Sequence, residues 1–184
     1  DEAIRCYKKA LELNTDSPMA YYNLGSAYQI QQNHEEACIY LEKACELDDD
    51  DEGFKVALAM SKMKMGKFKE ASNVYKNLLV QHPEKENYKY NLVTCYEAMG
   101  ELDTAIKMLE GMVYVNQKFI LPAQKLASLY IKTNQLNKAK DLYDNILLKG
   151  QVTAETFHQY AILSSSLCDT DTAERMLKKV IKMN

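Results

Sequence analysis

The chain has 184 residues, of which 47% are hydrophobic and 27% charged, so it carries enough apolar side chains for a folded core. Its 23 Lys and Arg are outnumbered by 26 Asp and Glu, which excludes an overall basic surface of the kind that neutralises nucleic-acid phosphates. No stretch approaches the roughly 20 apolar residues that a membrane span needs. We therefore expect neither nucleic-acid binding nor membrane insertion.

Helical periodicity and capping residues predict a chain made of helices. Ser17 and Pro18 form an N-cap followed by a first-turn proline. Other expected helix starts are marked by Asp103, Asn137 and Thr153, and expected helix ends by Gly66, Gly100 and Asn134. The expected helices cover 1-14, 18-31, 35-47, 52-65, 69-81, 86-99, 103-116, 120-133, 137-149, 154-167 and 171-183.

A single unit of 34 residues repeats along the chain without insertion or deletion. Its clearest mark is a column of alanines at this spacing: Ala3, Ala37, Ala71, Ala105, Ala139 and Ala173. A second column contains Leu24, Leu58, Leu92, Leu126 and Tyr160, each followed by a small or medium-sized residue. Two short helices cannot bury their apolar faces alone, so identical units should stack and share a continuous core.

The best-formed unit reads Tyr21-Tyr22-Asn23-Leu24-Gly25-Ser26-Ala27-Tyr28 and continues to Ala37 and Leu41. This pattern resembles the tetratricopeptide repeat, in which two helices form a hairpin. The resemblance implies an all-α fold, a right-handed superhelical α-solenoid of helix-turn-helix hairpins. It also implies a scaffold that binds proteins, with the first helix of each hairpin lining a concave groove.

We expect one array over 1-184. Residues 1-17 supply the second helix of a partial repeat, and full repeats cover 18-51, 52-85, 86-119, 120-153 and 154-184. Because the chain starts inside a repeat, we expect it to be part of a longer protein. We also expect the terminal helices to attract contacts from other molecules, since their apolar residues exceed what one neighbour covers.

The expected groove carries the candidate partner-binding residues. They are Tyr22, Asn23, Ser26, Met60, Met63, Tyr90, Asn91, Thr94, Lys125 and Lys132. Asn23 and Asn91 occupy the repeat position at which, in the family that the chain resembles, an asparagine binds a peptide backbone. The resemblance implies the same role here, since an amide side chain can both donate and accept hydrogen bonds. Met60 and Met63 would add an adaptable apolar patch.

No catalytic pattern emerges from the residues. His34, His82 and His158 fall at unrelated phases of the repeat, and the acidic turn from Asp48 to Asp51 lacks the ligand spacing of a calcium loop. The five cysteines form no C-x-x-C motif, which is typical of reduced thiols in the cytoplasm. We expect no enzyme activity, no cofactor and no metal.

The expected function is a non-enzymatic scaffold that binds a peptide or protein segment in the concave groove. Two alternatives remain open. The chain could assemble into homo-oligomers through its terminal helices or convex surface, or it could recruit partners for a larger enzyme.

Overall fold

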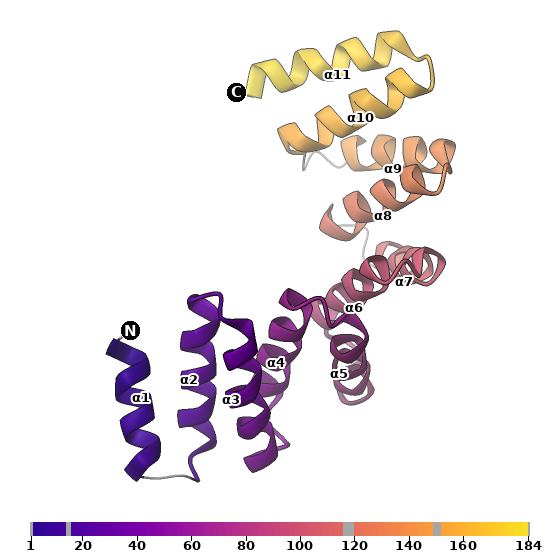
Figure 1. Cartoon of the computed structure of the whole chain (residues 1–184). Helices are drawn as coiled ribbons and strands as arrows, with labels where there is room; N and C mark the ends of the chain where they lie inside the picture. Colours follow the sequence, from indigo (N-terminus) through magenta and orange to yellow (C-terminus); the bar gives the residue numbers. More distant parts are fainter. Residues whose placement is uncertain (1, 14–15, 116–119, 149–151, 184) are drawn as a thin grey trace. The chain divides into compact units, whose positions relative to one another are not determined.

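The computed structural model describes residues 2–13, 16–115, 120–148 and 152–183, and its regular elements are helices (Figure 1). Their bounds are α1 Glu2–Leu13, α2 Pro18–Ile30, α3 His34–Leu47, α4 Glu52–Lys64, α5 Phe68–Gln81, α6 Glu86–Ala98, α7 Leu102–Val115, α8 Ile120–Lys132, α9 Leu136–Leu148, α10 Ala154–Ser166 and α11 Thr170–Met183. The predicted all-α solenoid class is confirmed.

The expected helix limits agree with the structure to about one residue. Ser17 and Thr153 are N-caps as predicted, because their hydroxyls accept hydrogen bonds from the amides of Ala20 and Thr156. Asp103 and Asn137 were expected to start helices and instead lie inside them, since α7 and α9 begin one residue earlier, at Leu102 and Leu136. The expected ends at 1, 14, 116 and 149 lie outside the described residues.

The helices form two compact units. The first, Asp1–Gly100, contains α1 to α6, and the second, Glu101–Asn184, contains α7 to α11. Within each unit every helix packs against the next one along the chain (Figure 1). This sequential packing is what a repeated hairpin predicts, because each unit of the repeat touches only its neighbours.

The alanine column marks the points where the two helices of a hairpin approach closely. Ala37, Ala71, Ala105 and Ala139 are fully buried, whereas Ala3 is exposed on α1. Opposite Ala37 lies Gly25 of α2, where an added Cβ would come within 2.7 Å of Leu41 Cγ and 3.2 Å of the Ala37 carbonyl oxygen. The small residues are therefore required by the distance between the two backbones.

A further column at the repeat spacing closes each first helix; Gly66, Gly100 and Asn134 were expected there as helix ends, whereas Gln32 and Cys168 were not. The backbone adopts a left-handed conformation at five positions spaced by 34 residues: Gln32 (φ 60°), Gly66 (77°), Gly100 (79°), Asn134 (59°) and Cys168 (59°). After Gln32, Gly66, Asn134 and Cys168 the following amide bonds a carbonyl five residues back, as from Asn33 to Tyr28 (3.0 Å) and from Asp169 to Ser164 (2.8 Å). This is the Schellman termination of a helix, which glycine or asparagine adopts with least strain.

We expect Ala71→Leu to lower the free energy of unfolding by about 1–3 kcal/mol, because the added side chain would overpack a fully buried hairpin crossing. Urea unfolding followed by circular dichroism measures the change. Ala98→Leu, at an exposed position of α6, is the matched control. Equal stability of the two variants would contradict the assignment of Ala71 to a crossing.

We expect Gln32→Gly to raise the free energy of unfolding by about 0.5–1 kcal/mol, since glycine adopts a left-handed backbone without the strain of a Cβ. Gln31→Gly, one residue earlier at φ −77°, should bring no gain. Thermal unfolding of both variants tests this. A larger stabilisation from Gln31→Gly would show that the left-handed backbone is not the source of strain.

Candidate functional site

The first helices of successive hairpins are joined directly by side-chain hydrogen bonds. Gln29 on α2 donates from Nε2 to the Ala57 carbonyl and to Ser61 Oγ on α4, each at 2.8 Å. Tyr88 on α6 donates to Glu52 at the start of α4 at 2.6 Å. In the second unit Gln124 on α8 donates to Thr156 on α10. These bonds hold the helices that carry the candidate partner-binding residues in a continuous row within each unit.

In the first unit the structure places eight of the candidate residues on three first helices. Tyr22, Asn23 and Ser26 lie on α2, Met60 and Met63 on α4, and Tyr90, Asn91 and Thr94 on α6. All except Met60 are half-buried, and Met60 has 49% of its surface exposed.

Several of these side chains already have partners within the unit. The Tyr22 ring packs against Phe54 with centroids 5.0 Å apart, and Asn91 donates from Nδ2 to the Tyr75 hydroxyl at 3.1 Å. Thr94 donates to the carbonyl of Tyr90 on its own helix at 3.0 Å. Asn91 therefore links α6 to α5, a structural role that its repeat position did not predict.

Apolar side chains at the end of α2 and on α4 are accessible to solvent. Besides Met60, Ile30 at the end of α2 is 85% exposed, and Met63 is half-buried on α4. Asn23 and Ser26 are half-buried polar residues of α2, the helix that Gln29 joins to α4. Together Ile30, Met60 and Met63 with Asn23 and Ser26 form what we call the α2–α4 surface.

The two remaining candidates lie in the second unit, on α8. Lys125 is half-buried and Lys132, at the end of the helix, is exposed. The two lysines therefore belong to another unit than the α2–α4 surface.

Charged side chains form a column on the second helices, and those on α1, α3, α5, α7 and α9 contact the following first helix. Its members are 34 residues apart: Lys8, Glu42, Lys76, Glu110, Asp144 and Lys178. Lys8 and Lys76 lie over the rings of Tyr28 and Tyr96, at 5.7 and 5.3 Å from the centroids. Glu110 accepts a hydrogen bond from Tyr130 at 2.6 Å, and Asp144 accepts one from Tyr160 at 2.5 Å.

At Glu42 the partner on the following first helix is a lysine instead of a tyrosine. Lys62 stands where Tyr28 and Tyr96 stand in neighbouring repeats, and its ammonium lies 3.0 Å from Glu42 and 2.9 Å from Glu70. Burial lowers the pKa of Lys62, but the bonds to Glu70 and Glu42 outweigh it and hold the pKa above its usual value. Tyrosine is thus the partner of cationic and anionic members of the column alike, and Lys62 opposite Glu42 is the exception.

The histidines show no catalytic arrangement in the part of the chain that the structure describes. His82 Nε2 lies 2.7 Å from Glu52, the same carboxylate that accepts from Tyr88, so it takes part in a polar link between α4 and the turn before α6. Among the described residues no group of three or more His, Cys, Asp and Glu side chains could hold a metal ion.

Comparison with protein-family models identifies three tetratricopeptide matches. A model described as TPR repeat matches residues 1–32, and two tetratricopeptide repeat models match residues 20–51 and 62–124. The chain belongs to the tetratricopeptide repeat family. A search of curated proteins finds no match.

Solved tetratricopeptide structures share the fold. YrrB, described as a tetratricopeptide protein with an unusual peptide-binding site, aligns with a TM-score of 0.69 and 19% identity over 99% of this chain and 94% of its own. MamA from Desulfovibrio magneticus RS-1 aligns with a TM-score of 0.78 and 17% sequence identity, and the alignment covers 90% of this chain and 94% of MamA. Pseudomonas aeruginosa pilF aligns with a TM-score of 0.73 and 20% sequence identity, and the alignment covers 96% of this chain and 80% of pilF.

Of the helices that the structure describes, none has both the length and the apolar character to cross a bilayer.

The second unit contains an ion pair whose loss at low pH should be measurable. Asp169 precedes α11, accepts from the Thr172 amide at 3.2 Å and pairs with Lys140 of α9 at 2.8 Å. Hydrogen bonding to Lys140, together with the Thr172 bonds, lowers the pKa of Asp169 from 3.8 to about 2. Because the folded pKa lies below the unfolded one, the contribution to stability is complete above pH 3.8 and disappears as the pH falls toward 2.

We therefore expect Asp169→Asn to reduce the loss of stability between pH 4 and pH 2, while keeping the amide-accepting cap. Unfolding midpoints in urea at several pH values test this. Asp171→Asn, an exposed acid inside the first turn of α11, is the control. Identical acid sensitivity in the parent and in Asp169→Asn would contradict the role of this pair.

Proposed function

We propose that this protein is a non-enzymatic scaffold that binds a peptide or protein segment on the α2–α4 surface. The observation that carries the proposal is the exposed methionine Met60 on α4, a helix that the Gln29 bonds to Ala57 and Ser61 join to α2 with its half-buried polar residues Asn23 and Ser26. Flexible thioether side chains adapt to different apolar partners. The family membership and the peptide-binding site attributed to YrrB support the same class of function.

The chemistry of the surface favours an uncharged, apolar stretch of the partner. Asn23 is the amide best suited to bond the partner's backbone, because part of the capacity of Asn91 is used by Tyr75. Tyr22, whose ring packs against Phe54, precedes Asn23 on α2 and is a further proposed contact. Tyr90, Thr94, Lys125 and Lys132 remain proposed partner contacts on α6 and α8.

Selection of peptides from a displayed library against the 184-residue protein tests this proposal. We expect selected peptides to bind with micromolar affinity, about −8 kcal/mol. Met60→Glu should weaken them at least tenfold, because the loss of one buried methionine contact costs about 1.5–3 kcal/mol.

Asp50→Ala, in the exposed acidic turn before α4, is the control and should leave affinity unchanged. The α2–α4 surface is the wrong site if Met60→Glu binds as well as the parent, or if Asp50→Ala is the variant that loses binding. Circular dichroism checks that both variants keep their helices.

A further inference from the structure

Lysines gather where α4 ends and α5 begins. Lys64 is the last residue of α4, Lys67 is the N-cap of α5, and Lys69 is the second residue of that helix. All three side chains are exposed, and none forms an ion pair with a residue that the structure describes. Glu70, the nearest acid in the sequence, is bound to Lys62 at 2.9 Å. We call Lys64, Lys67 and Lys69 the α4–α5 lysine cluster.

The cluster reverses the chemistry that α3, α7, α9 and α11 have at their start. The residue before each of these helices and the second residue inside it are acids or amides: Asn33 and Glu35, Glu101 and Asp103, Gln135 and Asn137, Asp169 and Asp171. Acids are favoured there because the helix macrodipole places partial positive charge at the N-terminus. Lys67 and Lys69 are therefore unfavourable for α5, and Lys67 makes no side-chain capping bond.

The lysine at the start of α6 differs from the cluster because it has partners. Lys85 is the N-cap of this helix, and its ammonium lies 3.6 Å from a carboxylate oxygen of Glu52. It also lies over the Tyr88 ring, 5.8 Å from the centroid. A structural role within the first unit therefore accounts for Lys85.

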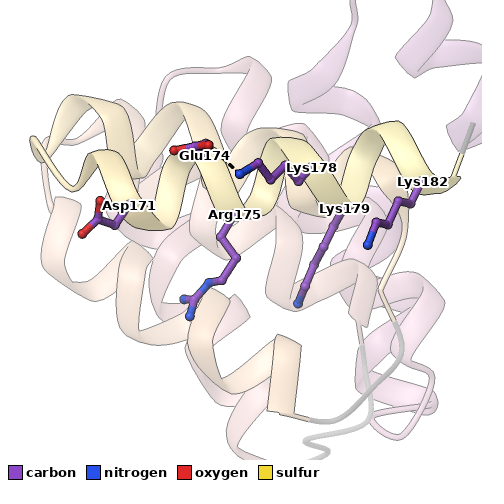
Figure 2. Close-up of a pocket in the computed structure, with 6 residues that line it drawn as sticks. All are labelled: Asp171, Glu174, Arg175, Lys178, Lys179 and Lys182. Carbon is purple, nitrogen blue, oxygen red and sulfur yellow. Dashed lines mark ion pairs between the residues drawn. The ribbon is translucent and has the colours of Figure 1, made fainter.

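The lysines of α11 are accounted for as well (Figure 2). Lys178 pairs with Glu174 at 2.6 Å, and Lys179 lies over the Phe157 ring at 4.9 Å from the centroid. Lys182 is in the last turn, where the macrodipole favours a cation. The α4–α5 lysine cluster has no such explanation, and a local conflict of this kind is typical of a functional surface.

The cluster adjoins the α2–α4 surface. Lys64 follows Met60 by four residues on α4, so the two side chains lie one turn apart on the same face of the helix. Ile30 holds the equivalent repeat position at the end of α2, and Gln29 joins the two helices there through its bond to Ser61. A segment that covers Ile30 and Met60 therefore has the Lys64 ammonium next to it and the rest of the cluster across the turn.

We propose that the segment bound on the α2–α4 surface carries acidic residues directly beside its apolar stretch, and that their carboxylates bind the α4–α5 lysine cluster. This inference rests on the proposed function and adds to it the charge of the partner. The carboxylates neutralise cations that have no counter-ion among the described residues, and the N-terminus of α5 favours their negative charge.

Three displayed peptide libraries test the inference. Each contains random uncharged cores of equal length, flanked at either end by a run of glutamate, of serine or of lysine. Selection against the whole 184-residue protein should enrich the glutamate-flanked peptides. Selection against the variant that combines Lys64→Glu, Lys67→Glu and Lys69→Glu should enrich the lysine-flanked peptides, because the charge of the cluster is reversed.

Fluorescence anisotropy with one selected glutamate-flanked peptide gives the magnitude. The triple variant should weaken binding about tenfold or more, since each exposed ion pair contributes up to about fivefold. Added salt should weaken binding to the parent and have less effect on a serine-flanked peptide. The matched reversal on α11, which combines Lys178→Glu, Lys179→Glu and Lys182→Glu, should change affinity less than about twofold. Circular dichroism checks that both variants keep their helices.

The single substitution Lys69→Glu separates binding from a structural role. It places at the start of α5 the acid that Glu35 supplies on α3, so the thermal unfolding midpoint should rise. The affinity for the glutamate-flanked peptide should fall about two- to fivefold. If Lys69 serves stability alone, the midpoint falls and the affinity stays the same, which contradicts the inference.

Failure of this inference can be told apart from failure of the proposed function with Met60→Ala, which leaves the charge of the surface unchanged. Peptides that are weakened by Met60→Ala but selected equally often with all three flanks overturn this inference alone. A glutamate run without an apolar core that binds as tightly as the selected peptide also overturns it, because the cluster then binds any anion. Absence of any selected peptide, or selected peptides that bind Met60→Ala as tightly as the parent, overturns both proposals.

Discussion

The close approach of two backbones at each hairpin crossing is the constraint on which the rest of the structure depends. At the Gly25 position an added methyl group would collide with Leu41. With Ala37 buried on the opposite helix, the backbones come close enough for Leu24 and Leu41 to be completely enclosed. The large residues can therefore fill the core only because the small residues at the crossing leave no gap between the helices.

A second set of contacts fixes how hairpins follow one another. Burial of apolar side chains is non-directional, so it holds neighbouring hairpins together without fixing their register. The polar contacts from Gln29 to Ser61, from Tyr88 to Glu52 and from Lys62 to Glu42 have defined geometry and supply that register. The bonds from Gln29 to Ser61 and from Tyr88 to Glu52 also hold the first helices next to one another. The position of the helix that carries Met60 therefore depends on these two bonds.

The sequence predicted the helices well because their causes are local or strictly periodic. The spacing of Ala37, Ala71 and Ala105 determines the phase of every hairpin, and caps such as Ser17 determine where helices start. The site was harder to predict, because the repeat position of a side chain indicates its direction but not its partner. Asn91 was assigned to a bound peptide, yet its amide also donates a hydrogen bond to Tyr75 of the neighbouring helix.

The charged column could have been found by aligning Lys8, Glu42 and Lys76 at the repeat spacing, but its pairing with Tyr28, Lys62 and Tyr96 required the structure.

The presence of both signs of charge in that column affects which helices can pack together during folding. Repeated units of similar sequence can exchange places during folding, because their apolar faces are nearly equivalent. Here the helices are not equivalent: Lys76 of α5 set against Lys62 of α4 would bring two ammonium groups together, whereas Glu42 of α3 attracts Lys62. The pairing of Glu42 with Lys62 thus penalises at least one misordered stack that the leucine and alanine columns alone would tolerate.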